Sequence, residues 1–213
     1  MTMKFWIFDL DNTLHDASPH IFPHINHSMT AYLQQHLQLD EVAANTLRID
    51  YWQRYGATLT GMMRHHATDP DHFLQHTHQF PELEKMVLRE PRLSHILKAL
   101  PGKKIVFSNA PQHYANAVLK LLKIDSLFDD VIAIEHSGYR PKPDNFGFFK
   151  LLKKHKVKAA QCVMVEDSLA NLRTAKKLGM RTVWVNAGQQ NEACVDVKIR
   201  NVMQLPKMLN HLN

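Results

Sequence analysis

Glycine, proline, cysteine and long apolar stretches are all scarce in this chain of 213 residues. Its 7 glycines and 10 prolines are too few for a collagen-like or low-complexity protein. No apolar stretch approaches the roughly 20 residues that a membrane-spanning helix needs. The apolar segment at the amino terminus meets two aspartates at once, which does not suit a signal peptide. We therefore expect a soluble globular protein that has no membrane partner.

Cysteine usage and charge narrow the class further. The two cysteines, Cys162 and Cys194, have no spacing typical of a disulfide framework, so a reducing, cytoplasmic location is expected. Lys and Arg exceed Asp and Glu by 26 to 20, which gives a net charge of +6. The densest basic run, residues 153–158, follows a helical pattern, where cations suit the negative end of the helix dipole. We interpret this run as a solvated helix end; a noncatalytic nucleic-acid-binding protein remains an alternative suggested by charge alone.

Five short apolar runs have the length and composition of buried parallel strands. They cover residues 5–8, 104–107, 131–134, 162–165 and 182–185. Helical spacing lies between the later runs, as at Ala115, Val118 and Leu122. This alternation predicts an α/β protein with a Rossmann-like, doubly wound parallel sheet.

The first two runs are about ninety residues apart, far more than a crossover connection needs. The intervening sequence is rich in Leu, His, Gln and Met, with helical spacing at Met29, Leu33 and Leu37 and a helix start at Asp69 and Pro70. Its histidines lack a cysteine partner, so we do not predict a zinc site there. We predict a helical cap domain at residues 16–95, inserted into a Rossmann-like catalytic core of residues 1–15 and 96–213.

Two carboxylates, Asp9 and Asp11, follow the first strand directly. Because side chains alternate along a strand, both project to one side, at the carboxyl end where open α/β sheets bind ligands. Carboxylates held this close in a buried position need a cation. An aspartate-rich turn is the alternative interpretation, since Asp and Asn favour turns.

Polar side chains also follow the second and third runs. Ser108, with the backbone amides of Asn109 and Ala110, precedes a helix start, an arrangement that binds phosphate oxygens. Lys142 lies between two prolines, which fix the backbone on both sides and hold the ammonium in place. Taken singly, these patterns also fit an ordinary helix cap and a surface turn.

The fourth run ends in Glu166 and Asp167, whose carboxylates are oxygen ligands of the kind that Mg²⁺ takes. Chance would scatter such residues over loops and helices, whereas here they follow successive strands in order. With these motifs the chain resembles the haloacid dehalogenase-like hydrolase superfamily over essentially its whole length. The resemblance implies a hydrolase that cleaves small phosphomonoesters.

The resemblance also implies a role for each motif. Asp9 is expected to be the nucleophile that forms an aspartyl-phosphate, and Asp11 the general acid and base. Mg²⁺ is expected to bind Asp9, the Asp11 carbonyl oxygen and Asp167, with Glu166 in or next to the first coordination sphere. The residues expected to bind the phosphoryl group are Ser108, Asn109, Ala110 and Lys142.

Residues 51–62 resemble the cap signature of the pyrimidine 5′-nucleotidase branch, with Trp52 in place of a tyrosine. This resemblance implies hydrolysis of UMP, CMP or a deoxy counterpart, with Tyr51, Tyr55 and Thr58 as substrate contacts. Because the tyrosines recur at helical spacing, packing in the cap core is an alternative role for them. A phosphatase or phosphomutase acting on a sugar phosphate also remains open. We expect a monomer or homodimer.

Overall fold

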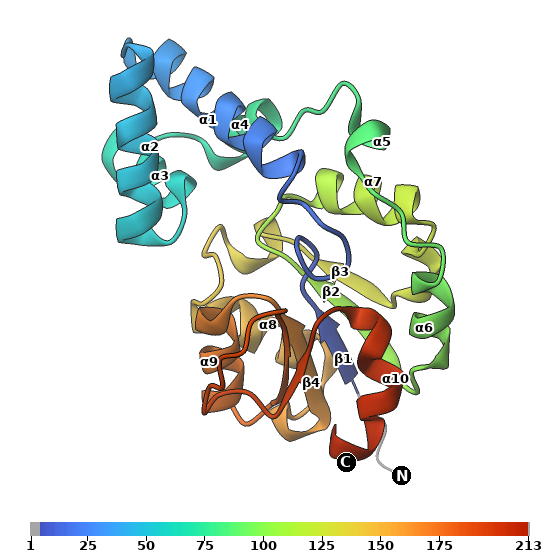
Figure 1. The fold of residues 1–213 in the computed structure, drawn as a ribbon. Coiled ribbons are helices and arrows are strands. Elements are labelled where there is room, and N and C mark those ends of the chain that lie inside the picture. Colours follow the sequence, from blue (N-terminus) through green and yellow to red (C-terminus); the bar gives the residue numbers. More distant parts are fainter. Residues whose placement is uncertain (1–4, 213) are drawn as a thin grey trace.

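The computed structural model describes residues 5–212, so the parts of our predictions that concern residues 1–4 and 213 lie outside it (Figure 1). The strands are β1 (Phe5–Phe8), β2 (Lys103–Phe107), β3 (Asp130–Ile132), β4 (Cys162–Glu166), β5 (Arg181–Val185) and β6 (Val197–Ile199). They form one sheet in the order β3-β2-β1-β4-β5-β6, and every neighbouring pair is parallel. The predicted α/β fold with a doubly wound parallel sheet is confirmed.

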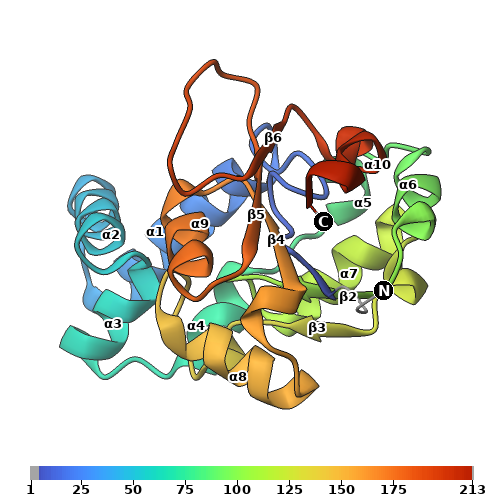
Figure 2. The same ribbon diagram turned by 90° about the horizontal axis from the view of Figure 1, so that it is seen from below.

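Alternate residues of β1 supply the two faces of the sheet. Trp6 and Phe8 pack on one side with residues of α6 (Leu93–Ala99), α7 (Gln112–Leu122) and α10 (Leu205–Met208). Phe5 and Ile7 pack on the other side with residues of α8 (Asn145–His155) and α9 (Leu169–Lys177). Figure 2 shows these two helical layers on opposite sides of the sheet. β1 is apolar throughout, and its four residues are all buried, because both of its faces are covered.

Four helices between β1 and β2 form a separate group beyond the carboxyl ends of the strands (Figure 1). They are α1 (Ile21–Leu37), α2 (Glu41–Tyr55), α3 (Thr58–His66) and α4 (Pro70–Thr77). Their apolar faces enclose a core of their own, which includes Leu33, Met62 and Phe73. As predicted, α4 begins at Pro70, and the Asp69 side chain accepts the His72 amide 2.7 Å away.

The segment that returns from the cap helices packs on the sheet. Phe80 and both Leu83 and Met86 of α5 (Leu83–Met86) contact the core cluster around Trp6 and Phe8. The assignment of residues 16–95 to a cap domain stays a prediction. Short 3-10 helices complete the chain: η1 (Asp125–Leu127), η2 (Glu135–Ser137), η3 (Ala159–Gln161), η4 (Val202–Gln204) and η5 (Leu209–Leu212).

Two further features concern the surface. The basic run ends α8, where both Lys154 and His155 contact Asp130, at 2.6 and 2.8 Å, so part of its charge is used within the fold. Among residues 5–212, no helix combines the length and hydropathy that a membrane span requires.

Candidate active site

Asp9 lies where β1 ends, and its amide still continues the sheet by donating to the Val165 carbonyl at 3.0 Å. The chain then turns sharply at Asn12, whose φ of 58° lies in the left-handed region that Asn tolerates. The Asn12 side chain accepts the Ala17 amide at 3.0 Å, which closes the loop. The turn keeps Asp9 and Asp11 together at the carboxyl edge of the sheet.

Lys142 brings a buried ammonium to Asp9. Its Nζ atom lies 2.7 Å from Asp9 Oδ1, 2.9 Å from Glu166 Oε2 and 2.7 Å from the Phe107 carbonyl oxygen. The lysine backbone is held from both sides by the Asn109 side chain, which accepts the Lys142 amide at 2.7 Å and donates to the Lys142 carbonyl at 3.0 Å. Burial disfavours the charged amine, but Asp9 and Glu166 outweigh it and raise the pKa of Lys142.

Glu166, the last residue of β4, is hydrogen-bonded on both oxygens. Oε1 accepts the amides of Asp167 and Ser168, each at 3.1 Å, and Oε2 accepts Lys142 and the Asn171 side chain at 3.0 Å. Burial alone would raise the pKa of Glu166, but Lys142 and these donors outweigh it and hold the pKa below its usual value. A buried carboxylate with four donors is fixed in position.

Three carboxylates meet at this edge of the sheet. Asp9, Glu166 and Asp167 bring ligand oxygens within 4.8 Å of one another, and they form the one group among residues 5–212 suited to a metal ion. Burial raises the pKa of Asp9 to about 7, with a further contribution from Glu166. Burial, followed by hydrogen bonding to Glu166, raises the pKa of Asp167 to about 8. Acids in this state gain most from a cation that stabilises their ionised forms.

Asp11 is bound by two residues that the sequence analysis did not single out. The Tyr114 hydroxyl donates to Asp11 Oδ1 at 2.6 Å, and His15 Nε2 lies 2.9 Å from the same oxygen. Tyr114 lies on α7, 103 residues farther along the chain, so no local pattern connects it with Asp11. His15 follows Asp11 by four residues, and the turn at Asn12 returns it to the acid.

The loop after β2 differs in detail from the expected phosphate-binding arrangement. The Ala110 amide donates to Ser108 Oγ at 3.0 Å, so this amide has a partner within the loop. The first amide of α7, that of Gln112, donates to the Glu135 carboxylate at 2.9 Å, which places an anion of the chain at that helix start. Ser108 is buried and lines the same cavity as Asp9.

Two cavities share part of their lining beside Asp11. The first, which we name the cap cavity, has a volume of about 650 Å³ and is lined by residues of α1, α2, α3 and α4 as well as Asp11 and Tyr139. The second, the carboxylate cavity, has a volume of about 640 Å³ and contains Asp9, Lys142 and Glu166 in its lining. Residues that line both include Asp11, Phe22, Trp52, Gly56, Asn109 and Ala110.

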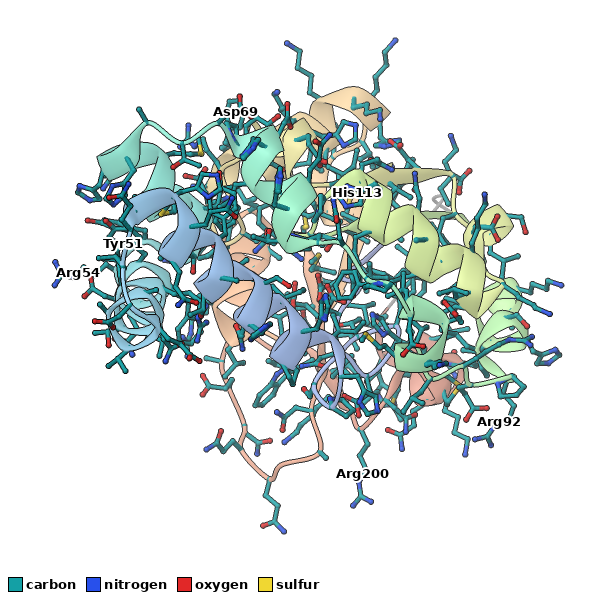
Figure 3. All side chains as sticks on the ribbon, turned by 90° about the horizontal axis from the view of Figure 1, so that it is seen from above. Tyr51, Arg54, Asp69, Arg92, His113 and Arg200 are labelled. Atoms are coloured by element: carbon teal, nitrogen blue, oxygen red, sulfur yellow. The ribbon has the colours of Figure 1, made fainter. Side chains whose placement is uncertain are left out.

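The cap residues expected to contact substrate separate into two groups. Thr58 lines the cap cavity and donates to the Arg48 carbonyl oxygen at 3.1 Å. Tyr51 and Tyr55 are absent from both linings; their hydroxyls lie 2.7 Å from His66 and His65. Figure 3 shows Tyr51 among the cap helices. The geometry therefore favours packing for the two tyrosines.

Trp52 and Arg48, both on α2, line the cap cavity in place of the tyrosines. Trp52 is 59% exposed, an unusual position for so large an apolar side chain. The sequence did contain an indication of this role, because Trp52 stands in place of a tyrosine within the cap signature. Nothing in the pattern around Arg48 indicated a cavity residue.

Known proteins are similar in sequence to most of this chain. A family model described as haloacid dehalogenase-like hydrolase matches residues 6–185. Phosphate metabolism protein 8 of Saccharomyces cerevisiae is 25% identical over 195 residues, covering 83% of this chain and 60% of the yeast protein. Glyceraldehyde 3-phosphate phosphatase of Pyrococcus furiosus is 22% identical, covering 99% of this chain and 93% of the archaeal protein.

A solved structure has the same fold. The phosphatase of this type from Thermococcus onnurineus superposes with a TM-score of 0.66 at 24% identity, covering 98% of this chain and 99% of the other. The matched residues begin in β1 and end in β5, so they include every motif from Asp9 to Asp167. The expectation of a hydrolase is confirmed: this chain belongs to the haloacid dehalogenase-like hydrolase family.

Proposed function

We propose that this protein is a Mg²⁺-dependent phosphomonoesterase that hydrolyses pyrimidine nucleoside 5′-monophosphates to a nucleoside and inorganic phosphate. The observation that carries the proposal is the carboxylate of Asp9, which contacts the buried ammonium of Lys142 in a cavity that also reaches Asp11. A nucleophile, a fixed cation and a second acid are the groups that a two-step phosphoryl transfer requires.

The cytoplasmic location and the monomeric or dimeric state remain predictions, the former supported by free thiols at Cys162 and Cys194.

Asp9 is the proposed nucleophile. One of its carboxylate oxygens bonds to phosphorus while the bond from phosphorus to the leaving oxygen breaks, and Asp11 gives that oxygen a proton. In the second step water attacks phosphorus and transfers a proton to Asp11, and the bond to Asp9 breaks. Ser108 binds a phosphoryl oxygen, and Lys142 exchanges its hydrogen bond to Asp9 for one to a phosphoryl oxygen as charge moves during each step.

The donor set at the carboxyl edge of the sheet fits Mg²⁺. Carboxylate oxygens of Asp9 and Asp167, together with the Asp11 carbonyl, are the hard ligands that this ion prefers. Glu166 lies in the same cluster, but its four hydrogen bonds suit it to orienting Lys142 and the loop at Asp167. Bound Mg²⁺ supplies positive charge between the nucleophile and an anionic substrate.

Asp11 favours phosphate esters over haloacids as substrates. Displacement of a halide by a carboxylate needs no proton for the leaving group, whereas an alkoxide leaving group does. Asp11 lines both cavities and therefore lies where a leaving group can occupy the cap cavity.

The walls of the cap cavity support a nucleobase as part of the substrate. They include Phe22, Met29, Trp52 and Phe73, and a volume of about 650 Å³ lies within the range of small-molecule sites. An aromatic base gains stacking energy on an exposed tryptophan. Arg48 Nη1 donates to Asn26 Oδ1 at 2.8 Å, and the remaining N–H groups of these two lining residues offer hydrogen bonds to the edge of the base.

A sugar phosphate is the second candidate substrate. The relative from Pyrococcus furiosus is named for glyceraldehyde 3-phosphate, and it matches nearly the whole chain. A triose would leave most of the apolar wall of the cap cavity uncovered, so we rank it below a nucleotide.

Phosphate release from UMP, CMP, AMP, glyceraldehyde 3-phosphate and phosphoglycolate tests the proposal, with Mg²⁺ and again with EDTA. We expect the pyrimidine nucleotides to give the highest kcat/KM, with activity lost in EDTA. The Asp9→Asn variant should fold and show no turnover. A strong preference for the triose phosphate would transfer the assignment to the second candidate, and activity that survives chelation would refute the metal requirement. Transfer of phosphate between hydroxyls without release would indicate a mutase.

A further inference from the structure

Asp11 carries two buried hydrogen-bond donors on one of its two carboxylate oxygens. The Tyr114 hydroxyl and His15 Nε2 lie 2.6 and 2.9 Å from Oδ1. Tyr114 is 1% exposed, and the His15 side chain is completely buried. No hydrogen bond from residues 5–212 reaches Asp11 Oδ2. The two oxygens of this acid are therefore not equivalent.

The surroundings of the histidine determine which atom donates. His15 Nδ1 is buried and has no hydrogen-bond partner among the described residues. A hydrogen on Nδ1 would be a buried, unpaired donor, which is costly. The neutral ring that carries its hydrogen on Nε2 avoids this cost and donates to Asp11.

Tyr114 is a fixed donor as well. Its hydroxyl donates to Asp11 Oδ1 at 2.6 Å, and because the residue is only 1% exposed, water does not compete for this hydrogen bond. Its ring packs against Phe80 and His78, with ring centroids 5.2 and 6.0 Å away. The hydroxyl therefore has little freedom to leave Asp11.

We propose that Tyr114 and His15 are positioning residues that direct the transferable proton of Asp11 to Oδ2. The proposal rests on the proposed phosphomonoesterase activity. Oδ1 already accepts two donors, so the proton that Asp11 must carry belongs on the other oxygen. Asp11 lines both cavities and its side chain is 15% exposed, whereas the two donors at Oδ1 are buried. Oδ2 is therefore the oxygen that we expect to face a group entering these cavities.

The two donors act in both steps of the reaction. As the bond from phosphorus to the leaving oxygen breaks, the proton moves from Asp11 Oδ2 to that oxygen, and the charge left on the carboxylate is stabilised at Oδ1 by Tyr114 and His15. In the second step Oδ2 takes a proton from the attacking water while the bond from phosphorus to Asp9 breaks. Asp11 returns to its protonated form with both hydrogen bonds in place.

Substrates with different leaving groups test this role. The first substrate is the alkyl phosphate with the highest kcat/KM among the compounds named above, and its leaving oxygen needs a proton. The second is p-nitrophenyl phosphate, whose leaving group, p-nitrophenolate, departs without one. The quantity to measure is kcat/KM, which reports formation of the aspartyl-phosphate from free enzyme and substrate. We expect Tyr114→Phe and His15→Leu each to lower kcat/KM for the alkyl phosphate by about 10- to 100-fold. For p-nitrophenyl phosphate, each variant should lower kcat/KM by less than about threefold.

Two further variants separate positioning from packing. His15→Gln keeps an N–H donor at this position and should recover part of the activity that His15→Leu loses. Tyr32→Phe removes the hydroxyl of another buried tyrosine, which lies on α1 and is hydrogen-bonded to His72 at 2.8 Å. This variant should leave kcat/KM unchanged for both substrates. Thermal unfolding of each variant provides the check on folding.

The outcomes distinguish this inference from the proposed function. Equal losses for both substrates in Tyr114→Phe and His15→Leu, or no loss for either, would overturn the positioning role while leaving the phosphatase assignment intact. A wild-type protein that hydrolyses neither substrate would overturn the proposed function and this inference with it. A selective loss with the alkyl phosphate supports both.

Discussion

Lys142 Nζ lies 2.7 Å from Asp9 Oδ1, and the lysine side chain that supplies this ammonium is only 1% exposed. The same nitrogen contacts Glu166, so one buried cation serves two buried acids. Such a group has a structural role beside its proposed catalytic one, because removing it leaves two buried carboxylates without a cationic partner.

The Lys142→Met variant should therefore be both inactive and unstable. We expect the free energy of unfolding to fall by about 3–5 kcal/mol, as for other broken buried ion pairs. Urea denaturation measures this change.

In the double variant Lys142→Met/Glu166→Gln, the loss of unfolding free energy should be smaller than the sum of the losses in the two single variants, since one of the unpaired charges is then gone. Strictly additive losses would contradict direct coupling between the two side chains.

The raised pKa values of Asp9 and Asp167 predict that stability falls with rising pH in EDTA. Their folded-state values of about 7 and 8 lie above the ordinary value of 3.8, so folding favours the protonated forms. This contribution is lost as pH rises through about 7 and then 8. Burial lowers the pKa of His78 to about 4, so this residue makes stability rise with pH. That rise is nearly complete by pH 6.5, the ordinary pKa of histidine, and so does not mask the decrease above it. We expect the unfolding midpoint to decrease between pH 6.5 and 8.

Mg²⁺ and one substitution provide the controls for this pH dependence. The ion should raise the midpoint more at pH 8 than at pH 6.5, because protons compete less for the carboxylates at the higher pH. Asp167→Asn should flatten the decrease seen in EDTA. A midpoint that rises with pH in EDTA would contradict the assigned directions of the shifts.

Trp52 is expected to contribute more to substrate binding than Tyr51. Stacking on a base contributes about 1–3 kcal/mol, so Trp52→Ala should raise KM for a pyrimidine nucleotide by about 10-fold. Inhibition by inorganic phosphate should stay unchanged, because Trp52 acts on the base. Tyr51→Phe removes only the hydroxyl that faces His66 and should leave KM unaltered. The reverse result would support the substrate contact predicted for Tyr51 from the cap signature.

Local sequence patterns were sufficient to predict most of the sheet. Four apolar residues at Phe5–Phe8, followed by two aspartates, specify a buried strand and the position of its polar end. β6 was missed because Val197–Ile199 is short and has Lys198 at its centre, as suits the edge of a sheet. The run expected at 131–134 ends at Ile132, since Ile134 already belongs to the turn into η2.

Contacts between distant segments could not be predicted in this way. Tyr114 reaches Asp11 only because α7 packs beside the loop after β1, and that packing depends on the whole sheet. The orientation of Tyr51 likewise depends on α3, where Gly61 leaves room for its ring. A motif gives the residue types of a helix, while its neighbours decide which face meets the cavity.

Gly61 is predicted to control the position of α2. A Cβ atom at residue 61 would lie 2.2 Å from Tyr51 Cγ and 2.6 Å from Tyr51 Cβ, atoms too close to the backbone to move aside alone. Gly61→Ala should therefore force α2 and α3 apart, lower the free energy of unfolding by about 1–3 kcal/mol and displace Trp52. Thermal unfolding and KM for the best substrate measure the two effects.

Gly188→Ala is the matched control for Gly61→Ala. Its new Cβ would meet only the Asn186 side-chain oxygen at 2.9 Å. That oxygen accepts the Gly188 amide at 2.7 Å, but the loop is exposed, so water can replace this hydrogen bond if the side chain turns away. We expect a change in unfolding free energy within about 0.5 kcal/mol and an unchanged KM. If Gly61→Ala were as mild as this control, α2 and α3 would have to separate freely, and these helices could not hold Trp52 at a fixed place in the wall of the cavities that Asp11 also lines.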